Sequence, residues 1–140
     1  MEAVANHLKL VETLSAATFE SNDPLAQMNA LEILAIVAET VDGIDCLEKA
    51  SVMSKVKQLG ANWKNDPLSS LLLPGLLKFV GKVGVVQLPP KELLQMVVEA
   101  IVESGDDVAL TTVGIEALAY IGSNPQGKQQ LDAESSKFYT

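Results

Sequence analysis

The chain has 140 residues, of which 48% are hydrophobic and 20% charged, and a chain of this length makes about one domain. Ten lysines and no arginine stand against 18 acidic residues, which leaves a formal net charge of −8. An acidic chain without guanidinium groups is poorly equipped to neutralise phosphates or to read guanine edges, so we expect no nucleic-acid partner.

Residues 1–8 lack the order of basic, apolar and small residues that makes a signal peptide. The longest apolar run, 71–86, is interrupted by a proline and two lysines, and its 16 residues are fewer than the ~20 that a spanning helix needs. Cys46 has no second cysteine with which to form a disulfide. We therefore expect a soluble protein with no membrane partner, located in the cytoplasm, with the nucleus as an additional compartment.

A helical period of apolar residues runs along most of the chain and predicts the following elements in order. They are a helix with the apolar stripe Val4, Leu8, Val11 and Leu14; a helix over 24–40, ended by the turn signal Asp42-Gly43; a short helix over 44–49; a helix over 51–59; a loop over 63–65; a helix over 67–86; a helix over 91–103, opened by Pro89-Pro90; a helix over 108–122; and a polar tail after Pro125. Pro74 should bend its helix, because proline removes a backbone hydrogen bond. No segment is persuasive as a strand, so the predicted fold class is all-α.

Three of these helices begin with related sequences. The tetrapeptide Asn-Asp-Pro-Leu starts at Asn22 and again 43 residues later at Asn65, and a looser copy surrounds Asp107, 41 residues beyond Asp66. Aspartate is a good N-cap, and proline fits the first helical position because its missing N–H would be unpaired there anyway. The repeated sequence therefore predicts three equivalent helix starts.

The residues after these caps also align. Ala38, Gly81 and Gly122 share one position, where small side chains would let neighbouring helices approach closely. The first and third copies match further, with Gly43 and Leu47 opposite Gly127 and Leu131. The period of 41–43 residues lies in the range of HEAT and armadillo repeats, about 40–47 residues.

We therefore predict a single α-solenoid over 1–140, a right-handed superhelix of about three HEAT/armadillo-like repeats. Its parts are the end of a preceding repeat (1–20), a repeat (21–63), a second repeat (64–104) and a partial repeat (105–140). No polar capping repeat closes either end, so we expect a piece of a longer array, whose exposed ends offer surfaces for self-association.

No pattern in the sequence predicts a reaction, so we expect no catalytic, cofactor-binding or metal-binding residue. His7 is the only histidine, and we interpret it as a surface or packing side chain. Cys46, without a histidine nearby, is typical of a buried structural cysteine. Asp106-Asp107 could be a carboxylate pair, but helix capping is the better interpretation. The rival class, a small helical hydrolase or transferase, would need clustered nucleophiles and bases.

The charges are unevenly distributed along the sequence. Seven of the ten lysines and a single acid, Asp66, fall within 49–91, giving +6, whereas the remaining three lysines and 17 acids give −14. This basic band has two interpretations. It is either a docking patch for an acidic segment of a partner or an ordinary solvated face.

In armadillo-type arrays the last helix of each repeat lines the concave surface, which here means 51–59 and 91–103. Their apolar positions are better explained as core, so the polar positions are the candidates for partner binding. These are Lys55, Lys57 and Gln58 on the first helix and Glu92, Gln95 and Glu99 on the second. Trp63, in the loop beside Lys64, is a further candidate: it is either a binding hot spot or a loop aromatic that folds back onto the array.

Two stretches carry a more specific resemblance: DPLSSLLLPGLLKFVGKVGV (66–85) and GIEALAYIGSNPQGKQQL (114–131). Within a collinear match over 23–131, they resemble the middle of the 26S proteasome non-ATPase regulatory subunit 5 family. The resemblance implies a HEAT/armadillo-like chaperone of proteasome base assembly that binds the C-terminal domains of proteasomal ATPase subunits and needs no cofactor. The alternative is an armadillo-type adaptor for another protein or peptide cargo, although such adaptors often carry asparagine and tryptophan ladders, which are missing from the predicted third helices.

Overall fold

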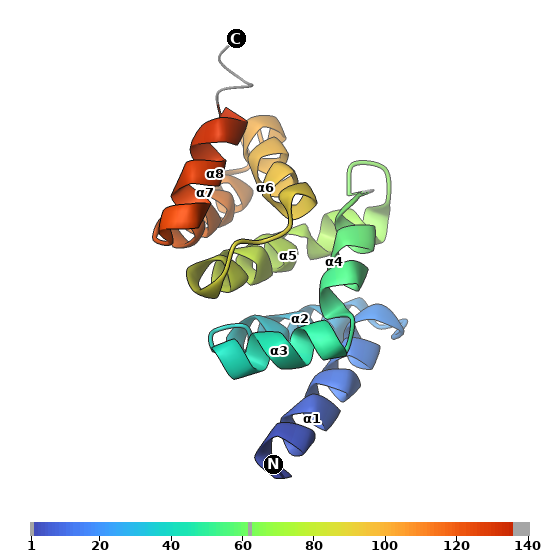
Figure 1. Ribbon diagram of the computed structural model, residues 1–140. Coiled ribbons are helices and arrows are strands. Elements are labelled where there is room, and N and C mark those ends of the chain that lie inside the picture. The colour runs from blue at the N-terminus through green and yellow to red at the C-terminus, as the bar shows by residue number, and fades with distance from the viewer. Residues whose placement is uncertain (1, 62, 136–140) are drawn as a thin grey trace.

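The computed structural model describes residues 2–61 and 63–135, and this part of the chain folds into eight α-helices without a strand (Figure 1). The helices are α1 (Glu2–Phe19), α2 (Pro24–Val37), α3 (Val41–Lys49), α4 (Val52–Ala61), α5 (Pro67–Val86), α6 (Lys91–Glu103), α7 (Val108–Gly122) and α8 (Pro125–Ser135). The predicted all-α class is confirmed.

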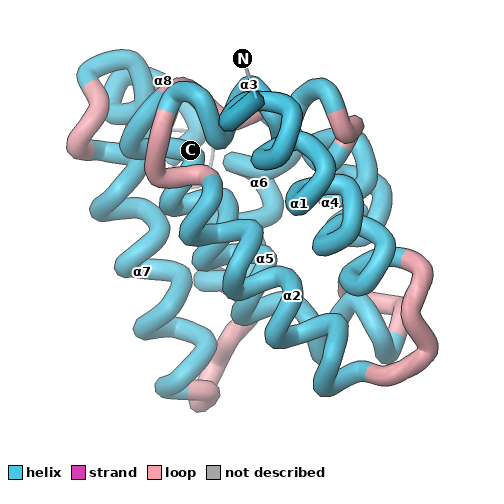
Figure 2. The backbone as a smooth tube through the Cα atoms, turned by 90° about the horizontal axis from the view of Figure 1, so that it is seen from below, coloured by secondary structure: helices cyan, strands magenta, loops and turns pink. Residues whose placement is uncertain are grey.

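The three helices that follow the aspartate caps pack side by side. α5 lies between α2 and α7, and Figure 2 shows these three long helices along one side of the molecule. Of the other helices, α1 and α3 lie beside α2, α4 lies beside α5 and α6, and α6 and α8 lie beside α7. From α1 at one end the chain advances through α5 to α7 and α8 at the other (Figure 1).

The central helix α5 supplies much of the core. Ten of its residues are buried, and Phe79, Leu76 and Leu77 are completely inaccessible. Its 20 residues are long and apolar enough to cross a membrane, so the expectation that this run is too short to do so is wrong. In this fold, however, 56% of its apolar stretch is buried against other helices, as in the core helix of a globular domain.

The aspartates start their helices as predicted. The side chains of Asp23, Asp66 and Asp107 accept hydrogen bonds from the backbone N–H groups two or three residues later. Asp107 therefore caps α7, as predicted. Within the described side chains, which exclude those of Val4 and His7, the predicted first stripe is also helical, with Val11 buried.

The boundary between α2 and α3 differs from the prediction. The chain turns at 38–40, whereas Asp42-Gly43, interpreted as a turn signal, lies in the first turn of α3. Thr40 is the N-cap, and its hydroxyl accepts a hydrogen bond from the Gly43 N–H at 2.9 Å. A Cβ on Gly43 would lie 1.8 Å from the Val37 carbonyl oxygen. Glycine is needed at this position for close packing between two helices, not to end one of them.

The polar tail expected after Pro125 is instead an eighth helix. The Asn124 side-chain oxygen accepts the N–H of Gln126 at 3.0 Å, so Asn-Pro opens α8 much as Asp-Pro opens α2 and α5. A Cβ on Gly127 would lie 2.1 Å from the Ile121 carbonyl oxygen, and this repeats the Gly43 contact 84 residues later. The turn between α7 and α8 therefore has the same packing requirement as the turn between α2 and α3.

Small residues allow α5 and α7 to approach closely. A Cβ on Gly81 would lie 2.8 Å from the Ala117 Cα, which confirms the predicted role of that position. The prediction is wrong for Gly122, where an added Cβ would meet only Leu131, at 3.9 Å. Helix α5 continues through Pro74 as one element, and its bend stays a prediction.

Candidate partner-binding groove

A groove of about 490 Å³ lies between α4 and α6, and the turn between α4 and α5 closes one end of it. Its lining combines a few apolar side chains with amides and charged groups. The lining residues are Lys57, Gln58, Gly60, Ala61, Trp63, Lys64, Asn65, Glu92, Leu93, Gln95, Met96 and Glu99. A groove of this size suits a side chain or a short segment of a partner.

The floor of the groove is apolar and tightly built. Leu93 and Met96 of α6 are buried, and Trp63 packs against the core cluster while also lining the groove. Met96 lies directly over Gly60, where an added Cβ would be 2.4 Å from the methionine sulfur. The missing side chain of Gly60 therefore leaves space for Met96, a flexible and polarizable side chain suited to a binding surface.

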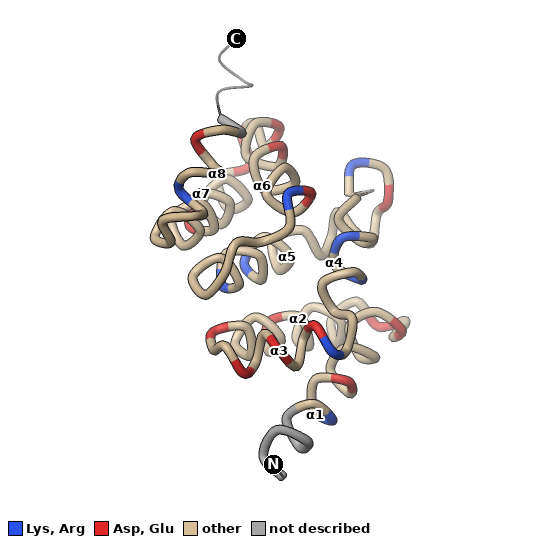
Figure 3. The backbone as a smooth tube through the Cα atoms, viewed as in Figure 1, with Lys and Arg blue, Asp and Glu red and all other residues tan. Residues whose placement is uncertain are grey.

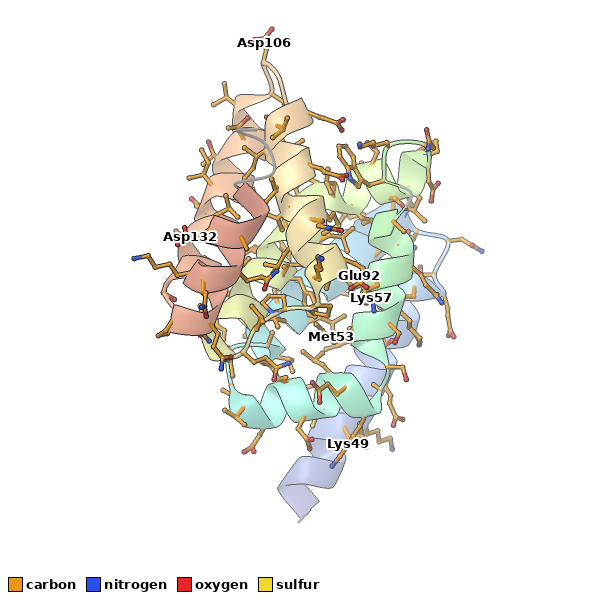
Figure 4. All side chains as sticks on the ribbon, turned by 45° about the horizontal axis from the view of Figure 1, so that its top comes forward. Lys49, Met53, Lys57, Glu92, Asp106 and Asp132 are labelled. Carbon is orange, nitrogen blue, oxygen red and sulfur yellow. The ribbon has the colours of Figure 1, made fainter. Side chains whose placement is uncertain are left out.

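Ion pairs span the two walls of the groove. Lys57 of α4 faces Glu92 of α6, with 3.8 Å between Nζ and Oε2 (Figure 4). Lys64 of the turn lies 3.5 Å from Glu99 and 3.0 Å from Glu103. These side chains are exposed, so each pair contributes little to stability.

Lys64 is the shared cation of this cluster. Its hydrogen bond with Glu103 raises the pKa of Lys64 above its ordinary value, so the ammonium stays charged at neutral pH. The same ammonium lies 5.8 Å from the ring centroid of Trp63, within reach of a cation–π contact. One lysine therefore connects the aromatic floor of the groove with its acidic rim.

The structure brings together six of the seven side chains singled out from the sequence: Lys57, Gln58, Trp63, Glu92, Gln95 and Glu99 all line this groove. Lys55 lies elsewhere. Its ammonium donates to the Ser15 hydroxyl at 3.2 Å and lies 5.9 Å from the ring centroid of Phe19, both on α1. Sequence reasoning missed Asn65 and Met96 as lining residues, although each is adjacent to a residue that it named or discussed.

The basic band of the sequence is not a basic surface in the fold. Besides the pairs in the groove, Lys49 pairs with Asp45 and Lys82 with Glu39, each at 3.0 Å (Figure 3 shows the mixed charges along the backbone). Folding brings acids from outside the band next to its lysines. Four of the seven lysines of the band are therefore balanced by nearby acids, and the docking patch stays a prediction.

Comparison with known proteins places the chain in a family. Residues 2–140 match the family model described as proteasome non-ATPase 26S subunit. The chain belongs to this family. It is 28% identical over 120 residues to the human (Homo sapiens) 26S proteasome non-ATPase regulatory subunit 5, which covers 83% of this chain and 24% of that protein. The corresponding protein of Drosophila melanogaster is 26% identical over 122 residues, covering 84% of this chain and 24% of its own length.

This member of the proteasome non-ATPase 26S subunit family thus spans about a quarter of the length of the curated relatives it matches. No solved structure matches the chain. Both relatives are named as non-ATPase regulatory subunits of the proteasome.

The groove in this family member combines hydrogen-bonding, charged and apolar side chains. Amides, two lysines and two glutamates surround an apolar floor, and such groups bind and orient a polypeptide. Among the described side chains, those of residues 8–61 and 63–133, no three His, Cys, Asp or Glu lie close enough together to hold a metal ion. Cys46 is buried, as predicted.

Proposed function

We propose that the chain is a non-enzymatic protein-binding scaffold that acts in assembly of the proteasome base and binds the C-terminal domains of proteasomal ATPase subunits. The match of residues 2–140 to the proteasome non-ATPase 26S subunit family carries this proposal. The ATPase domains as partners come from the sequence resemblance, and the α4–α6 groove is the surface that we assign to them. The proposed location is the cytoplasm, with the nucleus as an additional compartment.

The proposed architecture is a HEAT/armadillo-like solenoid of about three repeats. Two observations support it: α2, α5 and α7 lie side by side, and Gly43 and Gly127 make equivalent contacts at equivalent turns. In such an array, a preformed surface binds one arrangement of its client and blocks others by its shape. This role needs no cofactor and no chemical step.

A second candidate function is an adaptor for another protein or for a peptide cargo. The groove itself favours it, because Gln58, Asn65 and Gln95 place three side-chain amides around Trp63. An amide both donates and accepts hydrogen bonds, so it can pair with the backbone of an extended peptide. The two functions differ in the partner and not in the surface.

Calorimetric titration with isolated C-terminal domains of the proteasomal ATPases tests the proposal. We expect saturable binding to one of them and a loss of about tenfold or more in the double variant Gln58→Ala/Gln95→Ala. Among the described residues, neither amide has a hydrogen-bond partner, so the helices should be unaffected.

The control is Gln126→Ala/Gln129→Ala, which removes two exposed side-chain amides from α8 and should leave the affinity unchanged. Failure of every ATPase domain to bind a chain with native helicity refutes the proposed function. Equal affinity of the groove and control variants would retain the partner but assign it to another surface.

A further inference from the structure

Acidic side chains of α6 lie along the α4–α6 groove. The acids of α6 and of the turn that follows it are Glu92, Glu99, Glu103, Asp106 and Asp107. The described lysines opposite them are Lys57 and Lys64, and Lys64 is shared between two glutamates. Of these acids, Glu92, Glu99 and Glu103 pair with the two lysines, so three carboxylates meet two cations at the groove, and two of the three lie at the C-terminal end of α6. Asp106 projects away beyond that end of α6 (Figure 4).

The carboxylates around Lys64 can accept a second cation from a partner. Its bond to Glu103 is shorter than its contact with Glu99, 3.0 Å against 3.5 Å, so Glu99 is the less firmly paired carboxylate. All three side chains are about half exposed to solvent. Exposed ion pairs are weak, and a second cation can therefore pair with Glu99 while Lys64 remains on Glu103.

The apolar floor lies next to this acidic end. Trp63 and Met96 line the groove together with Glu99, and Lys64 touches both the indole ring and the glutamates. A partner side chain resting on Trp63 and Met96 would therefore place its neighbouring residues beside Glu99 and Glu103. Gln58, Gln95 and Asn65 remain available to pair with the partner's backbone.

We propose that the α4–α6 groove recognises an extended polypeptide segment in which an apolar side chain is followed by lysine or arginine. The apolar side chain contacts Trp63 and Met96, and the cation pairs with Glu99 or Glu103. The proposal rests on the proposed function, since it specifies the partner chemistry of the same surface. The net charge of −8 adds long-range attraction for such a segment, because complementary charge accelerates encounter.

Trp63 makes the test direct, because it is the only tryptophan in the chain and it lines the groove. The probes are short glycine–serine peptides with one leucine followed by two lysines, two glutamates or two glutamines. Titrated into the whole chain, the lysine peptide should change Trp63 fluorescence saturably and bind about tenfold more tightly than the glutamate peptide. Added salt should weaken the lysine peptide most.

The variant Glu99→Gln/Glu103→Gln should abolish this preference for lysine. The control Glu12→Gln/Glu20→Gln removes the same charge from exposed positions of α1 and its end, and should leave the preference unchanged. A preference for glutamate, no binding of any peptide, or a lysine preference that survives in Glu99→Gln/Glu103→Gln would each refute the proposal.

The two proposals fail separately. If an ATPase domain binds through the amides but binds the Glu99→Gln/Glu103→Gln variant equally well, the proposed function stands and the basic-segment proposal is wrong. If no ATPase domain binds while the lysine peptide shows the expected preference, the recognition chemistry stands and the proposed partner is wrong.

Discussion

Asp66 and Asp23 occupy the same place in the repeated tetrapeptide, yet their carboxylates accept different sets of hydrogen bonds. Asp23 is exposed, and its carboxylate accepts one backbone N–H, that of Leu25, at 3.1 Å. Asp66 accepts the N–H of Leu68 at 3.3 Å and also the hydroxyl of Ser69 at 2.9 Å. Ser69 is only 1% exposed, so its hydroxyl depends on that carboxylate.

We therefore expect Asp66→Ala to destabilise the fold more than Asp23→Ala. Each variant loses a cap, which costs about 1 kcal/mol. Asp66→Ala also leaves the buried Ser69 hydroxyl without its side-chain partner, which adds about 1–3 kcal/mol. Urea unfolding followed by circular dichroism measures both changes, and equal losses would show that the Ser69 bond contributes nothing.

Gly43 and Gly122 are both helical glycines, but only one of them is crowded. We expect Gly43→Ala to lose about 1–3 kcal/mol of unfolding free energy, because its Cβ would overlap the backbone carbonyl of Val37. Gly122→Ala is the control, since its Cβ would lie 3.9 Å from Leu131 and alanine is the better helix former. Thermal melts of the two variants should move in opposite directions; a similar loss in both would contradict the packing argument.

At the scale of elements, Lys82 connects three helices. Its ammonium lies 3.0 Å from Glu39, just after α2, and 4.7 Å from the ring centroid of Tyr120 on α7. The hydrogen bond with Glu39 raises the pKa of Lys82 above 10.5. A raised lysine pKa stabilises the fold fully below the unfolded value, and this contribution is lost as the pH rises through the folded value.

We expect a double-mutant cycle of Lys82→Met and Glu39→Gln to give a coupling of about 0.5–1 kcal/mol at neutral pH. The coupling should be lost as the pH rises through the raised pKa of Lys82, because the lysine then loses its charge. Tyr120→Phe is the suitable background, because it retains the ring beside the ammonium but removes the hydroxyl. A coupling that stays constant from pH 7 to a pH at which Lys82 has lost its proton would show that charge does not hold these helices together.

Local chemistry made the helix starts predictable from sequence, whereas long-range packing decided the boundary between α2 and α3. Asp-Pro caps act within one turn, so α2 and α5 begin where the sequence indicates. Gly43 is required because the Val37 carbonyl, which belongs to another helix, leaves no room for a Cβ. Taken alone, the dipeptide Asp42-Gly43 indicates only a turn. The start of α8 was missed although Asn124-Pro125 carries the same local signal.

The sequence predicted part of the lining of the groove but not the contacts that depend on helix packing. The helical period placed Lys57 and Gln58 on one wall and Glu92, Gln95 and Glu99 on the other. Lys55 was misplaced because two residues along a helix correspond to a rotation of about 200°, which turns it toward α1. The meeting of Lys64 with Glu99 and Glu103 depends on how α6 packs, and spacing along the chain does not reveal it.

At the scale of the whole molecule, the two sides of the groove differ, because its α4 wall has fewer buried residues than α6 or the central helix α5. Ten residues of α5 are buried between its neighbours, but only Val52, Val56 and Gly60 are buried in α4. Helices with few buried contacts open more readily than the core to which they are attached. The backbone amides of α4 should therefore exchange with solvent before those of α5. A partner bound in the groove should slow hydrogen exchange in α4.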